Sequence, residues 1–124
     1  MDNQPIIDAS VLRGLVEIAG DQPQALLEEL FTLLLESGEV QAATIRTAAP
    51  DDFNAITRAA HTLKGAAGSV GATQVARIAG QIESQARLLQ LGPWQNMADE
   101  LQHALARLRD AAIALGYYAA AKAV

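Results

Sequence analysis

The segment around His61 contains the residues of this sequence best suited to chemistry. In AHTLKGAAGSVGA, residues 60–72, His61 is followed by Lys64, Gly65 and Gly68. In an α-helix this spacing of i, i+3, i+4 and i+7 places all four residues on one face. A neutral imidazole is a good nucleophile near pH 7, and phosphorylated imidazole keeps a high transfer potential. Because Lys64 offers a positive charge to a phosphoryl oxygen, this face suits phosphoryl transfer.

The two glycines predict a shallow notch beside His61. Each glycine lowers the stability of a helix by roughly 1 kcal/mol relative to Ala, so the presence of two on this face needs an explanation. Without their side chains, another protein could approach the imidazole ring closely. Close packing of helices is the alternative explanation, and for Gly68, nearer the helix end, the two explanations are evenly balanced.

A helix that begins after Asp51 or Asp52, as its N-cap, must position this face. Its buried stripe is predicted from apolar residues three and four apart, namely Phe53, Ile56, Ala60, Leu63, Ala67 and Val70. This stripe points away from His61, so we expect the imidazole to be exposed. Gly71 is expected to terminate the helix, with help from Ser69.

The other helices follow from apolar periodicity between segments rich in Gly, Pro and Asp. They are predicted at residues 9–19, 23–37 and 73–90, followed by a last helix from near Pro93 to Leu115. Asp8 and Ser10 are candidate caps, and Trp94 is expected to anchor a helix start. Leu89 and Leu115 continue the apolar patterns of their helices and are expected to be buried. Residues 40–49 form either a separate short helix or a continuation past Ser37-Gly38. Short connections imply antiparallel neighbours, so we expect an all-α, up-and-down four-helix bundle with an additional short N-terminal helix.

The composition excludes several classes of protein. The 124 residues suit one domain, residues 1–124, with a core at about 6–115 and an Ala-rich C-terminal tail expected to fray. The net charge of −5 and the scattered cations argue against nucleic-acid binding. There is no cysteine, no apolar run long enough to span a bilayer and no signal-peptide pattern, so we expect a cytoplasmic protein without membrane insertion. We also expect a monomer.

The segment at residues 60–72, with its His, two residues and Lys-Gly, resembles the signature of the histidine-containing phosphotransfer (HPt) domain family. The resemblance covers roughly residues 6–115, including an acidic, leucine-rich second helix. It implies that His61 accepts a phosphoryl group through its outward ring nitrogen, that Lys64 assists charge neutralisation, and that Gly65 leaves room for a receiver domain. Glu83 and Arg87 occupy the places where the family often has a polar residue and an Arg facing the histidine. Glu83 differs from the amide of some members, which leaves its role open.

The resemblance implies a phosphocarrier in a two-component multistep phosphorelay rather than an independent enzyme, with no kinase activity of its own. Its partners would be receiver domains of response regulators or of a hybrid sensor histidine kinase. Candidate docking residues are Gly65, Gly68 and Arg87. The chain itself would need no cofactor, because the receiver brings Mg²⁺.

Two alternatives compete with the phosphocarrier. The first is a docking module that binds a receiver, or another regulatory protein, without carrying phosphate. The second is a metal-dependent bundle enzyme, for which Glu100 and His103 supply a single Glu-x-x-His fragment. Di-iron bundles use that fragment twice, so the metal hypothesis is weak and no metal site is expected.

Overall fold

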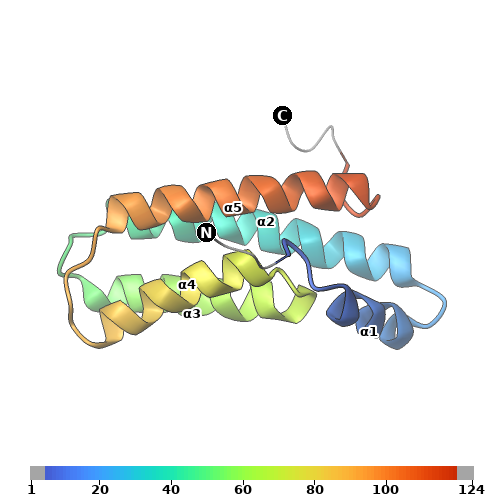
Figure 1. Ribbon diagram of the computed structural model, residues 1–124, viewed down its shortest axis with the longest axis horizontal. Helices are drawn as coiled ribbons and strands as arrows, with labels where there is room; N and C mark the ends of the chain where they lie inside the picture. Colours follow the sequence, from blue (N-terminus) through green and yellow to red (C-terminus); the bar gives the residue numbers. More distant parts are fainter. Residues whose placement is uncertain (1–4, 120–124) are drawn as a thin grey trace.

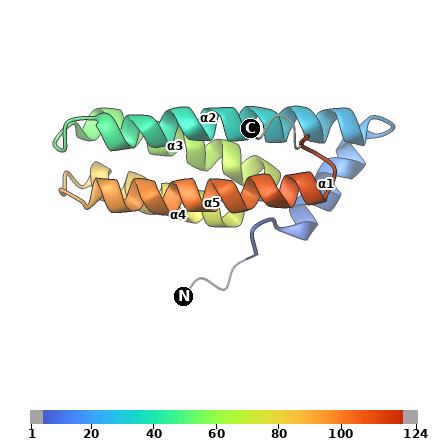
Figure 2. The same ribbon diagram turned by 90° about the horizontal axis from the view of Figure 1, so that it is seen from above.

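The computed structural model describes residues 5–119 and folds them into five α-helices. Their bounds are α1 Ala9–Ala19, α2 Pro23–Thr47, α3 Phe53–Val70, α4 Thr73–Arg87 and α5 Trp94–Ala114. Helices α2 to α5 form an antiparallel bundle in which α3 packs between α2 and α4 (Figure 1). Seen from above, α2 and α3 lie on one side and α5 and α4 on the other, so α3 and α5 are diagonal (Figure 2). The predicted all-α bundle with a short N-terminal helix is confirmed.

Local capping explains where α1 and α3 begin. The Asp8 carboxylate accepts from the backbone N–H of Ser10 at 2.9 Å, and the Asp52 carboxylate accepts from Ala55 N–H at 3.1 Å. A capping oxygen of this kind contributes about 1 kcal/mol by satisfying a free N–H of the first turn. The predicted starts of both helices are thereby confirmed, with Asp52 rather than Asp51 as the cap.

Helix α2 runs through Ser37-Gly38 without a break, which decides the open question about residues 40–49. Gly38 is buried, and a Cβ built there would lie 2.6 Å from Leu105 Cδ2 of α5. The glycine therefore permits close approach of α5 and does not end the helix. The tertiary contact compensates for the weak helix propensity of Gly.

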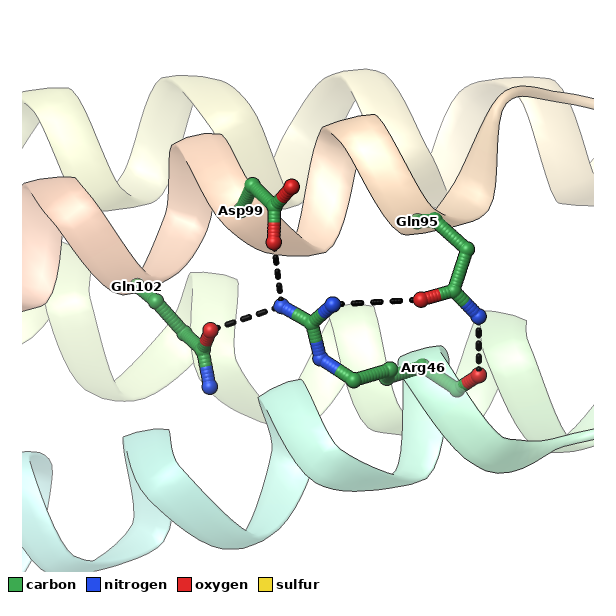
Figure 3. A network of polar contacts seen from close by, with 4 residues as sticks. All are labelled: Arg46, Gln95, Asp99 and Gln102. Carbon is green, nitrogen blue, oxygen red and sulfur yellow. Dashed lines mark hydrogen bonds and ion pairs between the residues drawn. The ribbon is translucent and has the colours of Figure 1, made fainter.

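A polar cluster ties the C-terminal part of α2 to α5 (Figure 3). The Arg46 guanidinium donates to Asp99 Oδ1 and Gln102 Oε1, each at 2.6 Å, and to Gln95 Oε1 at 3.1 Å. Gln95 in turn donates to the backbone oxygen of Arg46 at 2.8 Å. Nearby, the buried Trp94 indole donates to the Pro50 carbonyl at 2.9 Å, which confirms Trp94 as an anchor at the start of α5.

Two expectations about apolar residues are wrong. Helix α4 ends at Arg87 rather than near Gln90, so Leu89 lies in the following loop and is 70% exposed. Leu115 is the C-cap of α5 and is 48% exposed, because the helix ends before its side chain can reach the core. The Ala-rich tail was expected to fray, but residues 120–124 lie outside the described part.

Gly71, the C-cap of α3, contacts α1 and gives a prediction about stability. Its φ is +75°, and a Cβ there would lie 2.9 Å from Val11 Cβ. We expect Gly71→Ala to destabilise the protein by about 2–4 kcal/mol, through left-handed strain plus the clash with α1. Urea denaturation measures this change. Gly116→Ala is the matched control, because Gly116 has φ +83° but open space around it, and should cost only about 1–2 kcal/mol. Equal losses in both variants would contradict the contact with α1.

Candidate functional site

The site lies on the outer side of α3, where it packs against α4. His61 and Lys64 project from α3 with side chains 63% and 44% exposed, while Leu63 between them is fully buried in the core. The alternation follows from helical periodicity, because the apolar stripe and the His61 face lie on different sides of one helix. The predicted exposure of His61 is confirmed.

Glu83 of α4 is the hub of the site. Its side chain is only 5% exposed and contacts three nitrogen groups. Its Oε2 lies 2.6 Å from His61 Nδ1 and 2.9 Å from Arg87 Nη2. Its Oε1 lies 2.6 Å from Lys64 Nζ. A buried carboxylate is stable only when it is paired and hydrogen-bonded, and these three contacts meet that need.

These contacts lower the pKa of Glu83 to about 2. The hydrogen bond from Lys64 is the largest cause; those from Arg87 and His61 act in the same direction and together outweigh burial, which raises the pKa. Glu83 is therefore ionised at neutral pH and can only accept hydrogen bonds. It follows that His61 Nδ1 carries the proton and donates it to Glu83. In the neutral ring the lone pair is then on Nε2, which makes no hydrogen bond within residues 5–119.

The lowered pKa predicts how stability depends on pH. A carboxyl whose pKa falls on folding stabilises the native state above its unfolded pKa, here 4.5, and this contribution is lost as pH falls towards about 2. We expect the wild type to lose about 2–3 kcal/mol of unfolding free energy from this one group over that interval. The Glu83→Gln variant lacks it, so the two unfolding free energies should converge as pH falls. Urea denaturation of both proteins from pH 7 to pH 2.5 measures this, and parallel curves would contradict it.

Both predicted notch glycines are open to solvent. A Cβ at Gly65 or at Gly68 would meet no atom within 4 Å. Neither glycine is therefore required for packing between helices, which favours the notch over the packing explanation, for Gly68 as well. At the end of α3 the Ser69 hydroxyl donates to the Ala66 carbonyl at 2.8 Å, and Gly71 adopts the left-handed C-cap.

The structure brings Arg87 into the site, and it adds Glu83, whose role the sequence left open. A signal was present, because Glu83 lies on the apolar stripe of α4 beside Ile82 and Ala86, where a lone carboxylate needs cationic partners. His103 is exposed on α5, the helix diagonal to α3 (Figure 2). No group of three or more His, Cys, Asp or Glu residues in the described part is arranged to hold a metal ion. Within the same residues, no helix has the length and apolarity to cross a membrane.

This bundle, with an exposed histidine on the third helix, is the architecture of a histidine phosphotransfer domain, and comparison with known proteins agrees. The sequence matches the Hpt domain family over residues 29–111, more than half of the chain, and the chain belongs to that family. Among solved structures it is similar to histidine-containing phosphotransfer protein B (HptB) from Pseudomonas aeruginosa PAO1, with a TM-score of 0.75. The two share 23% identity over 88% of this chain and 92% of HptB, a likeness that concerns the fold. A search of curated proteins found no match.

Proposed function

We propose that this protein carries a phosphoryl group on His61 Nε2 between receiver domains of a two-component phosphorelay. The observation that carries the proposal is the 2.6 Å contact between His61 Nδ1 and the buried Glu83 carboxylate. It directs the Nδ1 proton to Glu83, so that in the neutral ring the nucleophilic lone pair lies on Nε2. Family membership supports the same class of reaction.

Phosphoryl transfer to His61 does not require any residue of this chain to act as a base. The Nε2 lone pair attacks the phosphorus of a receiver aspartyl phosphate, the N–P bond forms, and the P–O bond to the aspartate breaks. The aspartate leaves as a carboxylate. Because Nδ1 keeps its proton, the phosphorylated ring is left with a positive charge, and Glu83 lies beside it to stabilise that charge. The reverse sequence passes the group to a second receiver aspartate.

Lys64 and Arg87 provide charge stabilisation for the phosphoryl oxygens. In the resting site two permanent cations share one carboxylate, which leaves an excess of one positive charge next to His61. Both side chains are more than two-fifths exposed, at 44% and 59%, so they can turn towards an incoming phosphoryl group. Such preorganised charge is the main aid that a protein gives to phosphoryl transfer. The receiver would supply Mg²⁺, and this chain would need no metal of its own.

The test is transfer from a phosphorylated receiver domain in the presence of Mg²⁺, followed as acid-labile, base-stable label on this chain. The proposal expects label to appear on the wild-type protein and to pass on to a second receiver. A chain that binds receivers but is never labelled would instead be a docking module.

A further inference from the structure

The loop between α4 and α5 presents a cluster of exposed apolar side chains. Leu88, Leu89 and Leu91 are 67%, 70% and 67% exposed. A single exposed leucine is ordinary on a protein surface, but three within four residues form a patch of the kind that marks an interaction site. The core of the bundle does not use them.

The loop holds these leucines in a defined arrangement. Leu89 has φ +57°, a left-handed backbone conformation that is unfavourable for a leucine. Its N–H donates to the Ala86 carbonyl at 3.0 Å, and the Gln85 side chain donates to the Leu91 carbonyl at 3.0 Å. An apolar patch fixed in advance loses little conformational freedom when a partner binds.

A shallow, open groove of about 550 Å³ along the outer face of α4 connects this loop to the proposed transfer site. Lys64 lines one part of it, Leu88 and Gln90 line another, and Gly80 lies between, with Lys64 Cδ 3.5 Å from where a Cβ would be. Apart from Gly80 and Leu88, the residues that line it are polar or cationic. At the end of the groove, Lys64 and Arg87 share the single carboxylate of Glu83, which leaves an excess of one positive charge there in a chain whose net charge is −5.

The size of a protein interface indicates that a partner seated on His61 also covers this loop. A standard interface buries about 800 Å² per partner, which corresponds to a patch about 16 Å in radius. Leu88 follows Glu83, the hydrogen-bond partner of His61, by five residues, or about 7.5 Å along α4. Leu88, where the loop begins, thus falls inside the footprint of a partner centred on the imidazole.

We propose that Leu88, Leu89 and Leu91, with the groove along α4, form a docking surface for the receiver domain that exchanges phosphate with His61. The inference rests on the proposed function and extends it to partner recognition. The fitting receiver surface has acidic groups around its phosphorylated aspartate, facing Lys64 and Arg87, and an apolar patch that covers the leucines. This surface contributes binding, while His61 carries out the transfer.

The test compares two uncharged variants of the full chain. The first combines Leu88→Gln, Leu89→Asn and Leu91→Gln, with Asn chosen because it tolerates the left-handed backbone. The control is Leu115→Gln, a 48% exposed leucine at the other end of α5. The probes are receiver domains of response regulators from the same genome, loaded with Mg²⁺ and beryllofluoride to mimic the phosphorylated state. Calorimetry gives Kd, and circular dichroism confirms that both variants melt as the wild type does.

We expect the triple variant to raise the Kd of the tightest receiver at least tenfold and Leu115→Gln to change it by less than twofold. A Kd unchanged in the triple variant, or no binding of any receiver to the wild type, would overturn the docking surface. Phosphoramidate, a small donor that needs no docking partner, separates this result from the proposed function. It should label the triple variant as fully as the wild type. If it labels neither, the phosphoacceptor proposal fails, and the Kd comparison still decides the docking surface.

Discussion

A His61→Gln variant should take up no detectable phosphoryl group from a phosphorylated receiver, a loss of at least about a thousandfold in rate. Removal of the imidazole removes the only nucleophile that the mechanism uses. The fold should survive, because His61 is 63% exposed and a Gln amide can still donate to the Glu83 carboxylate. We expect the unfolding free energy to change by less than about 0.5 kcal/mol, as is usual for surface substitutions. Labelling and urea denaturation of the same preparation measure both effects.

The chain offers a matched control for this experiment. It contains two histidines, and the second, His103, is exposed on α5. His103→Gln removes the same imidazole from the helix diagonal to α3 and should leave the rate of labelling unchanged. Label retained in His61→Gln but lost in His103→Gln would move the acceptor to α5 and refute the assignment.

Gly65→Trp should reduce the rate of transfer from a receiver by about tenfold or more without unfolding the protein. The space next to Gly65 is open in the isolated chain, so an added side chain meets nothing there. Loss of the glycine should in fact stabilise α3, by up to about 1 kcal/mol for Gly65→Ala. The tryptophan side chain would occupy the space through which the receiver must approach His61, one turn of helix away. A loss of about 1.4 kcal/mol in the interaction with the receiver corresponds to a tenfold effect. Both variants should therefore be at least as stable as the wild type, while the rate of transfer falls in Gly65→Trp.

Receiver-dependent and receiver-independent labelling distinguish this explanation from damage to His61 itself. Phosphoramidate should still label Gly65→Trp at close to the wild-type rate, since the small donor does not need the notch. His103→Trp adds the same bulk on α5 and should transfer normally. A Gly65→Trp variant that exchanges phosphate with receivers at full speed would rule out the notch as the path of approach.

Local rules predicted the helices and the face that carries His61. The caps at Asp8 and Asp52 and the left-handed end at Gly71 depend on residues close in sequence, which is why sequence sufficed for them. The exposure of His61 followed from the three- and four-residue spacing of the apolar stripe. These features need no knowledge of which helices pack together.

Features that depend on contacts between helices were not predictable in the same way. The passage of α2 through Gly38 rests on Leu105 of α5, 67 positions further along the chain. The role of Glu83 depends on the register between α3 and α4, which sets its carboxylate 2.6 Å from both His61 and Lys64. Leu89 was misplaced because the apolar pattern of α4 continues past Arg87, whereas the backbone turns there. In each case a tertiary contact or a turn overrode the local pattern.

The most direct test of the account is to identify the phosphorylated nitrogen in the intact protein. The ¹⁵N-labelled chain would be phosphorylated with a receiver and Mg²⁺, and the coupling between phosphorus and the imidazole nitrogens would be read by NMR. The arrangement of His61 and Glu83 predicts phosphorus on Nε2 of His61, with the proton retained on Nδ1. Phosphorus on Nδ1, or on any residue other than His61, would contradict it.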